Sequence, residues 1–373
     1  MKKLKYLILT IMLSIALAAC SQTGEEGKPA AQEQKSKETE EKKEADSKAA
    51  DKKEEDKSDE TGKTSESTEP QKLTLVLDWV PNTNHTGLFV AKDKGYFAEE
   101  GLEVDIVQPA EDSASVIVGM GRAEFGIHFQ PNMVKRLLKK TPITAVAAIV
   151  QHNTGGIMSL KSSGISSPKE LAGKKYSTWE DPIDDATVQF ITEKDGGDWS
   201  KVELVPGEST DATTALQMKM FDAIFVYQGW DYIHAQTKQV DTNFFRLTDY
   251  APEFDYYTPV LIANDDFLAK QPEVAKRALR AIKKGYEFAA DNPAEAAEIL
   301  IRNAPEGDAD LIRASQEYLS TQYIADAESW GTIDRERWNR FYDWLYEQKL
   351  ITEPLTDKGF SNEYLPTVQA SGH

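Results

Sequence analysis

The stretch LTLVLDWVPNTNHTGLFVAKDKGYFAEEGLEVDI (Leu73–Ile106) contains the pattern that decides the fold class. LTLVLDW is a short apolar, partly β-branched run that is typical of a buried strand, and a Pro-Asn turn follows it. Helical periodicity then begins at His85 and ends at Gly95. LEVDIVQ (102–108) alternates apolar and polar residues like a second strand. Strand, helix and strand in this order predict a right-handed crossover unit in a largely parallel sheet.

The same alternation continues along the chain and predicts an α/β protein of two lobes. Further strands are expected at AEFGIHF (123–129) and TAVAAIV (144–150), with helices over 113–121 and 133–140. A second unit begins near Gly164, where Ser167-Pro168-Lys169-Glu170 is a capping box. Its predicted strands are KKYSTW (174–179), KVELV (201–205) and DAIFVY (222–227), with helices over 184–193 and 210–220. YYTPVLIAN (256–264) returns as a strand, and helices dominate thereafter.

These elements divide the folded part into lobe 1, residues 73–163 and 258–373, and lobe 2, residues 164–257. A lobe that is interrupted by another requires two crossings of the chain, and the crossings form a central hinge. Ligands of α/β proteins bind beyond the carboxyl ends of strands, so the sequence predicts a ligand cleft between the lobes.

The first 72 residues are expected to deliver and tether the protein. Residues 1–20 combine three lysines with an apolar run and end in Leu17-Ala18-Ala19-Cys20, which is typical of a lipoprotein signal peptide with lipid attachment at Cys20. Residues 21–72 contain no aromatic residue and no Val, Ile, Leu or Met. We therefore expect a disordered charged linker, with a weakly helical rod as the alternative.

Charge and cysteine content exclude several classes of function. Residues 73–373 carry 46 acidic and 29 basic side chains, an excess of negative charge that repels nucleic acid. Cys20 is the only cysteine, which excludes an intramolecular disulfide, a cysteine-based zinc site and an iron–sulfur cluster.

No motif for catalysis or for a cofactor is found. The sequence lacks a P-loop, a G-x-S-x-G elbow and an H-E-x-x-H zinc motif, and GMGRAEFG (119–126) has the wrong spacing for a dinucleotide fingerprint. The five histidines show no metal-ligand spacing. We therefore expect a protein without catalytic residues, metal or cofactor.

Aromatic, amide and acidic side chains instead recur at the ends of the predicted strands. Flat rings stack on a planar ligand while amides and carboxylates bind its edge, so this cluster favours a heteroaromatic solute. The candidate ligand-binding residues are Asp78, Trp79, Asn82, His85, Gln130, Asn153, Trp179, Glu180, Tyr227, Trp230, Asp231 and Tyr256. His128 lies within a strand pattern and is either an interior histidine or a cleft contact. Trp338, Phe341, Trp344 and Leu345 share one helix face and are expected in the core.

Four stretches of the chain closely resemble the ThiY-like group of periplasmic solute-binding lipoproteins. They are Leu77–Ile106, GRAEFGIHFQPN (121–132), IFVYQGWDY (224–232) and FDYYTPVLIAN (254–264). The resemblance implies a type II periplasmic binding protein fold that closes on a thiamine pyrimidine precursor, such as formylaminopyrimidine. It also implies delivery to an ABC permease and its ATPase. Asp78, Trp79 and Asn82 match the first cleft segment of the group, and Tyr227 matches its stacking tyrosine. Asp231 stands where pyrimidine binders tend to have a glutamate, a departure that bears on the exact ligand.

Three alternatives stay open at this point. The ligand could be riboflavin or another flat compound, or an aromatic or aliphatic sulfonate bound on the same fold. Fungal pyrimidine synthases, which are enzymes, resemble this chain in the Asp-Trp region. Their cysteine-rich iron motif is missing here, and His128 and Asn132 stand at the positions of their cofactor lysine and following histidine. The expected protein is a monomer, lipid-anchored and extracytoplasmic, at the outer face of a bacterial membrane or in a periplasm.

Overall fold

The computed structural model describes residues 69–109, 112–207 and 211–366. The predicted signal peptide with Cys20, and nearly all of the predicted linker, lie outside the described residues. Within the described ranges, no helix is both long enough and apolar enough to cross a bilayer.

Lobe 1 is built on a five-stranded mixed sheet with the strand order β2-β1-β3-β10-β4. β1 pairs in parallel with β2 and β3, and β10 pairs antiparallel with β3 and β4. The strands are β1 (Gln71–Val76), β2 (Leu102–Val107), β3 (Phe125–His128), β4 (Ile143–Ala148) and β10 (Val260–Asn264). The predicted unit of strand, helix and parallel strand is confirmed by β1 and β2. The sheet is mixed and not largely parallel as predicted, because β10 returns antiparallel between β3 and β4. β1 begins two residues inside the predicted linker.

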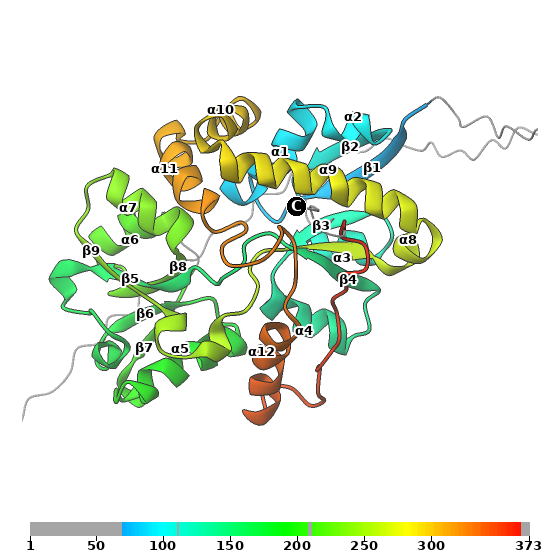
Figure 1. Cartoon of the computed structure of the whole chain (residues 1–373). Coiled ribbons are helices and arrows are strands. Elements are labelled where there is room, and N and C mark those ends of the chain that lie inside the picture. Colours follow the sequence, from blue (N-terminus) through cyan, green and yellow to red (C-terminus); the bar gives the residue numbers. More distant parts are fainter. Residues whose placement is uncertain (1–68, 110–111, 208–210, 367–373) are drawn as a thin grey trace, which may run out of the picture. The chain divides into compact units, whose positions relative to one another are not determined.

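Lobe 2 is built on a second five-stranded sheet with the order β7-β6-β8-β5-β9. β6 pairs in parallel with β7 and β8, while β5 pairs antiparallel with β8 and β9. The strands are β5 (Gly155–Leu160), β6 (Lys175–Thr178), β7 (Glu203–Pro206), β8 (Ala223–Tyr227) and β9 (Thr242–Arg246). Figure 1 shows β1–β4 in one group and β5–β9 in the other.

The first crossing of the chain lies earlier than the sequence predicts. The predicted boundary at Gly164 follows β5, but β5 belongs to the sheet of lobe 2, so the chain crosses between Ala148 and Gly155. β5 was not predicted as a strand because it begins with two glycines, which ordinarily weaken a strand. Glycine is needed at Gly156, where an added Cβ would lie 2.3 Å from the carbonyl oxygen of Phe245 on β9. The second crossing leads through Asp255–Pro259 into β10.

Helices flank both sheets. Those of lobe 1 are η1 (Thr83–His85), α1 (Thr86–Asp93), α2 (Tyr96–Glu99), α3 (Ala114–Gly119) and α4 (Gln130–Leu138). Those of lobe 2 are η2 (Lys161–Ser163), η3 (Pro168–Leu171), α5 (Pro182–Lys194), η4 (Trp199–Lys201), α6 (Ala212–Gln217), η5 (Gln228–Tyr232), α7 (Ile233–Thr237), η6 (Leu247–Asp249) and η7 (Pro252–Phe254). The predicted capping box is present at the start of η3. α4 begins three residues earlier than predicted, so Gln130 belongs to its first turn.

The C-terminal helices contact both lobes. They are α8 (Asp265–Lys270), α9 (Pro272–Asp291), α10 (Pro293–Asn303), α11 (Ala309–Ser320) and α12 (Arg335–Glu347). α9 packs closely on α1, since an added Cβ at Gly285 would lie 2.0 Å from the carbonyl oxygen of Gly87. α11 contacts α10 of its own group and also α7 and η5 of lobe 2.

The hydrophobic core of the described residues includes two large clusters. One cluster lies between the sheet of lobe 1 and helices α1, α9, α10 and α11. A second cluster includes residues of both sheets, with Val260 of β10 and Ile157 of β5 among them. Trp338, Phe341, Trp344 and Leu345 of α12 are buried in this second cluster, as the sequence predicts. α12 therefore helps to join the two lobes.

Candidate ligand-binding site

The two lobes meet where β3 and β8 end. Phe129 directly follows β3 in lobe 1, and Tyr227 is the last residue of β8 in lobe 2. Their ring centroids lie 6.5 Å apart and their planes differ by 14°, so the two rings face each other across the lobes. The Tyr227 hydroxyl also shares a hydrogen bond of 3.1 Å with Oγ1 of Thr258 in the second crossing. These contacts join both lobes to the hinge at the strand ends.

Three aspartates act on Tyr227 through their charges. Burial raises the pKa of the Tyr227 phenol, and the negative charges of Asp184, Asp78 and Asp231 raise it further, against a hydrogen bond to Thr258 that lowers it. Asp78 comes from lobe 1, whereas Asp184 and Asp231 come from lobe 2. The meeting point of the lobes is thus both aromatic and acidic.

Asp78 is held in position by a buried histidine. His85 Nε2 lies 2.6 Å from Oδ1 of Asp78, and His85 Nδ1 accepts the backbone N–H of Asn82 at 3.2 Å. Since an N–H group only donates, Nδ1 carries no proton and Nε2 must donate to the carboxylate. His85 is fully buried and both of its nitrogens are used within the protein. It acts on the site by fixing Asp78.

The two aspartates of lobe 2 lie in environments that disfavour their ionised forms. Burial raises the pKa of Asp184 to about 7, the charges of Asp181 and Asp185 add to the shift, and Lys135 opposes it. Burial also raises the pKa of Asp231 to about 6, against hydrogen bonds from the backbone that lower it. Such carboxylates are stabilised by any ligand that brings N–H donors or positive charge.

Two tryptophans that follow strands remain exposed. Trp79 follows β1 and is 46% exposed, and Trp179 follows β6 and is 48% exposed. Glu180, which has a positive φ of 56°, is exposed beside Trp179. The lobes are also joined here by an ion pair of 2.5 Å between Lys135 Nζ and Asp181 Oδ2. Large exposed apolar side chains at strand ends are available to cover a ligand.

Three amide side chains from the predicted site make their hydrogen bonds within the protein. The Gln130 amide donates to the carbonyl oxygen of Trp338 at 2.8 Å and accepts the N–H of Tyr257 at 2.8 Å. The Asn153 amide donates to the carbonyl oxygen of Phe254 at 2.8 Å and accepts the N–H of Gly155.

Asn82 caps η1 by accepting the N–H of Asn84 at 2.9 Å. All three amides are buried, and these bonds give them roles in turns and hinges.

Two of the predicted aromatic residues pack against hydrophobic cores. Tyr256 is 4% exposed and its ring centroid lies 4.6 Å from that of Phe341 on α12. Trp230 is partly buried against the first core cluster. The sequence predicted Tyr256 as the first residue of a strand, but β10 begins four residues later, at Val260. The sequence pattern carried no information on which side of the backbone either ring points.

Phe129 and Asp184 were not predicted as site residues. Phe129 is the last residue of the predicted strand 123–129, where an apolar side chain is expected in the core, whereas the structure ends β3 at His128. Asp184 stands in the first turn of α5, where acidic residues are common because they favour the helix dipole. Its burial depends on the packing of the lobes.

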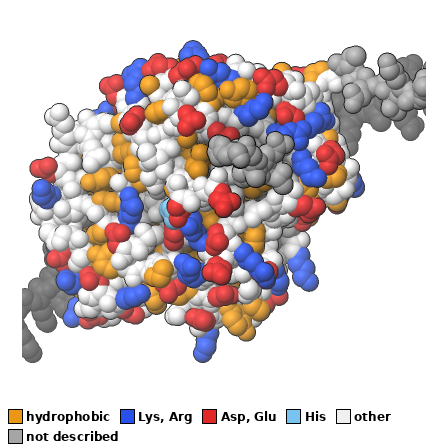
Figure 2. All heavy atoms as spheres, viewed as in Figure 1, with side chains coloured by type: hydrophobic (Ala, Val, Ile, Leu, Met, Phe, Trp, Pro, Cys, Tyr) orange, Lys and Arg blue, Asp and Glu red, His pale blue; other side chains and the backbone are white. Residues whose placement is uncertain are grey.

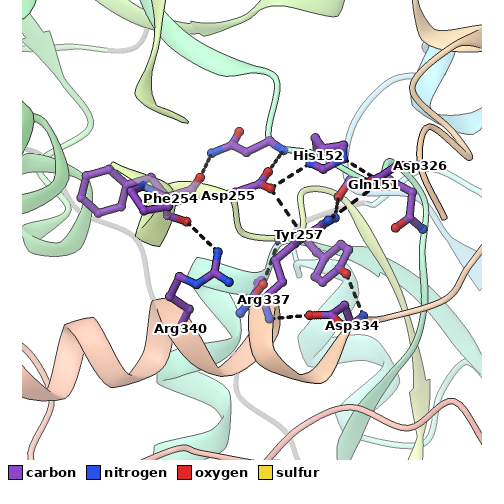
Figure 3. A network of polar contacts seen from close by, with 12 residues as sticks. Gln151, His152, Phe254, Asp255, Tyr257, Asp326, Asp334, Arg337 and Arg340 are labelled. Atoms are coloured by element: carbon purple, nitrogen blue, oxygen red, sulfur yellow. Dashed lines mark hydrogen bonds and ion pairs between the residues drawn. The ribbon is translucent and has the colours of Figure 1, made fainter. Parts of the chain in front are cut away.

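The hinge contains a network of charged groups (Figure 3). His152 in the first crossing bonds through Nδ1 to Asp255 of the second crossing at 2.8 Å and through Nε2 to Asp326 at 2.9 Å. Arg337 of α12 donates to the carbonyl oxygen of Gln151 at 2.6 Å. The hydrogen bond to Asp255 raises the pKa of His152, although burial opposes it. The network connects both crossings to the C-terminal segment.

Other parts of the described surface offer less to a ring-shaped ligand. A hollow of about 410 Å³ lies at the opposite end of β3, lined by residues that include Gly121, Glu124 and Asn264. Among the described residues, no group of three or more His, Cys, Asp or Glu side chains is arranged to hold a metal ion. On the face drawn in Figure 2, acidic and basic side chains intermingle. The acidic and aromatic meeting point of the lobes is the stronger candidate because it combines ring faces with polar groups.

Residues 82–296 match the model of the family described as NMT1/THI5 like, which is more than half of the chain. The chain belongs to the NMT1/THI5-like family. The match includes Asn82, Tyr227 and Asp231, and it extends across both crossings of the hinge.

Relatives of this NMT1/THI5-like chain include binding proteins and enzymes. A formylaminopyrimidine-binding protein from Halalkalibacterium halodurans is 28% identical over 302 residues, which cover 79% of this chain and 91% of the relative. A 4-amino-5-hydroxymethyl-2-methylpyrimidine phosphate synthase from Legionella pneumophila is 24% identical over 311 residues, covering 80% and 94%.

Among solved structures, the periplasmic aliphatic sulphonate binding protein SsuA from Escherichia coli superposes with a TM-score of 0.61 at 13% identity, covering 76% of this chain and 95% of that one. The likeness confirms the two-lobed periplasmic binding protein fold.

Proposed function

We propose that this chain is the extracytoplasmic solute-binding component of an ATP-driven importer and that it binds a planar heteroaromatic nutrient, a thiamine pyrimidine precursor. The observation that carries the proposal is the pair of facing rings, Phe129 and Tyr227, with three aspartates around it. Aromatic faces bind a flat ring by stacking. Carboxylates accept hydrogen bonds from amino groups on the edge of that ring.

The charge of the site favours this ligand over an anion. Asp78, Asp184 and Asp231 act on Tyr227 as negative charges, and burial already disfavours the ionised forms of Asp184 and Asp231. A sulfonate would add a further like charge in a poorly solvated place. An aminopyrimidine offers N–H donors instead, and its protonated form is a cation. The name of the Halalkalibacterium relative, a formylaminopyrimidine-binding protein, supports the same class of ligand.

The synthase alternative lacks support from the residues at the strand end. The synthases of this family use a lysine to hold pyridoxal phosphate, and the position that resembles it is His128. An imidazole has no primary amine, so it cannot form the Schiff base that holds this cofactor. We propose that the ligand is bound and released chemically unchanged.

Binding would act through closure of the lobes about the hinge. A ligand that touches Asp78 and Phe129 of lobe 1 and Tyr227 of lobe 2 gains contacts only when the lobes are together, so it shifts the equilibrium toward the closed state. The permease of the importer would recognise that state. Cys20, if lipid-modified, would keep the protein at the membrane surface; the mass of the mature N-terminal peptide tests this directly.

Calorimetric titration of the purified protein tests the proposed ligand class. The probes are 4-amino-5-hydroxymethyl-2-methylpyrimidine, its formylaminomethyl analogue, riboflavin and an alkanesulfonate. We expect binding of the aminopyrimidines and none of the alkanesulfonate, with the ligand recovered unaltered by mass spectrometry. Binding of the sulfonate alone, or recovery of a converted product, would refute the proposal.

A further inference from the structure

His128 and Asp78 stand at the same end of the sheet of lobe 1. β1 and β3 pair in parallel, with Val76 opposite Gly126. His128 is the last residue of β3, and Asp78 follows the end of β1 by two residues. β10 pairs on the other side of β3, with Val260 opposite His128, and this pairing fixes the backbone of His128.

The side chain of His128 has an unused hydrogen-bonding atom. His128 is 9% exposed, and its Nε2 is buried without a hydrogen-bond partner in the described part of the chain. The backbone of Asn132, in the first turn of α4, raises the pKa of His128, which is the effect of a carbonyl oxygen that accepts from the ring. Because Nε2 has no partner, we assign the interacting N–H to Nδ1. The neutral ring then carries its proton on Nδ1 and a free lone pair on Nε2.

The surroundings keep the ring uncharged at neutral pH. Burial lowers the pKa of His128 to about 4, and the positive charge of Arg136 on α4 lowers it further. The Asn132 backbone and the Asp78 carboxylate act in the opposite direction without restoring the ordinary value. An acceptor that is buried and unpaired destabilises a folded protein, and natural structures contain few of them. Such an atom at the meeting point of two lobes is typical of a group that is completed by a ligand.

We propose that His128 is a ligand contact of lobe 1, where its unprotonated Nε2 accepts a hydrogen bond from an amino group on the edge of the ligand ring. The inference rests on the proposed function and narrows its ligand class. Asp78 and His128 are both acceptors at this end of the sheet. An exocyclic amine has two N–H donors, one for each of them. A ligand that has acceptors alone on that edge leaves both groups unpaired.

Substitution of His128 separates this role from a structural one. H128N keeps an amide donor near the position of Nδ1 for the Asn132 carbonyl and removes the acceptor at Nε2, whereas H128Q places an amide oxygen near the position of Nε2. We expect H128N to bind 4-amino-5-hydroxymethyl-2-methylpyrimidine about 10- to 100-fold more weakly than the wild type. H128Q should recover part of this loss. H234N, the same substitution on α7, is the matched control and should bind like the wild type.

The probe itself supplies a second control. The pyrimidine in which hydrogen replaces the 4-amino group should bind the wild type and H128N with the same, weaker affinity, because it offers no amine to the missing acceptor. Equal affinity of H128N and wild type for the amino compound would overturn the inference while leaving the proposed function standing. Failure of the wild type to bind any aminopyrimidine would overturn both.

Nitrogen NMR keeps the inference testable if the variants do not fold. In ¹⁵N-labelled wild-type protein, the Nε2 resonance of His128 should be that of an unprotonated imidazole nitrogen, and it should shift when the aminopyrimidine is added. An Nε2 resonance that stays unchanged at saturation contradicts the proposed hydrogen bond.

Discussion

Replacing Asp184 with asparagine removes a carboxyl group that the fold keeps from ionising. Its pKa is raised from 3.8 to about 7 by burial, with Asp181 and Asp185 adding to the shift. A folded-state pKa above the unfolded value means that the stabilising contribution is complete below pH 3.8 and is lost as the pH rises through about 7. Asparagine has nearly the same shape and never ionises. The variant should therefore be more stable than the wild type in neutral and alkaline solution.

The size of the effect follows from the shift in pKa. About three pKa units correspond to about 4 kcal/mol in the free energy of unfolding above pH 7. Asp184 is only partly buried, and solvent screening reduces this value, so we expect about 2–4 kcal/mol. For a protein of this size the corresponding rise in Tm is roughly 5 °C at pH 8.

Calorimetric melting of wild type and D184N at several pH values between 4 and 8 is the assay. The two Tm curves should converge toward pH 4 and separate as the pH approaches 8. E193Q is the matched control, since Glu193 lies on the same helix, loses the same charge and is exposed. We expect its stability to change by less than about 0.5 kcal/mol. Parallel Tm curves for D184N and wild type, or a less stable D184N at pH 8, would show that Asp184 is not held in its protonated form.

Three further predictions concern the hinge and the strand ends. The raised pKa of His152 means that its bonds stabilise the fold fully below pH 6.5 and that this stability is lost as the pH rises through the higher folded-state pKa. In H152Q, Tm should therefore fall less steeply above pH 6.5 than in the wild type. An unchanged slope contradicts the role of the network. Q130A should lower the free energy of unfolding by about 2–4 kcal/mol, because it leaves buried partners unpaired, and urea denaturation measures this loss. W79A and W179A should leave Tm nearly unchanged, since both rings are largely exposed. Each variant should weaken ligand binding by about 1–3 kcal/mol if the ring it removes stacks on the ligand. Unchanged affinity of both variants in calorimetric titration would remove these tryptophans from the site.

Local patterns were enough to predict the fold class and most of the strands along the chain. Alternation in 102–108 and the apolar run in 144–150 correspond to β2 and β4, because a strand buried on one or both faces must carry these periods. β5 and β9 were not predicted. The two glycines at the start of β5 give no strand signal, and the place of Gly156 is fixed by close contact with β9, whose paired residue, Arg246, lies 90 residues away in sequence.

The residues of the candidate site, too, could be predicted only in part from the sequence. Strand-end positions identified Asp78, Tyr227 and Asp231 as candidates, and the charges of Asp78 and Asp231 both raise the pKa of the Tyr227 phenol. The pattern could not distinguish them from Gln130, whose amide is used to connect α4 to the second crossing and α12.

The sequence by itself determined which residues stand at the ends of strands, because periodicity is a property of neighbours along the chain. Only the tertiary structure decided which of those side chains keep a free polar atom at the meeting point of the lobes. Hydrogen-bond satisfaction and burial depend on partners far away in sequence, such as Trp338 for Gln130 and the packed lobes around Asp184 and His128.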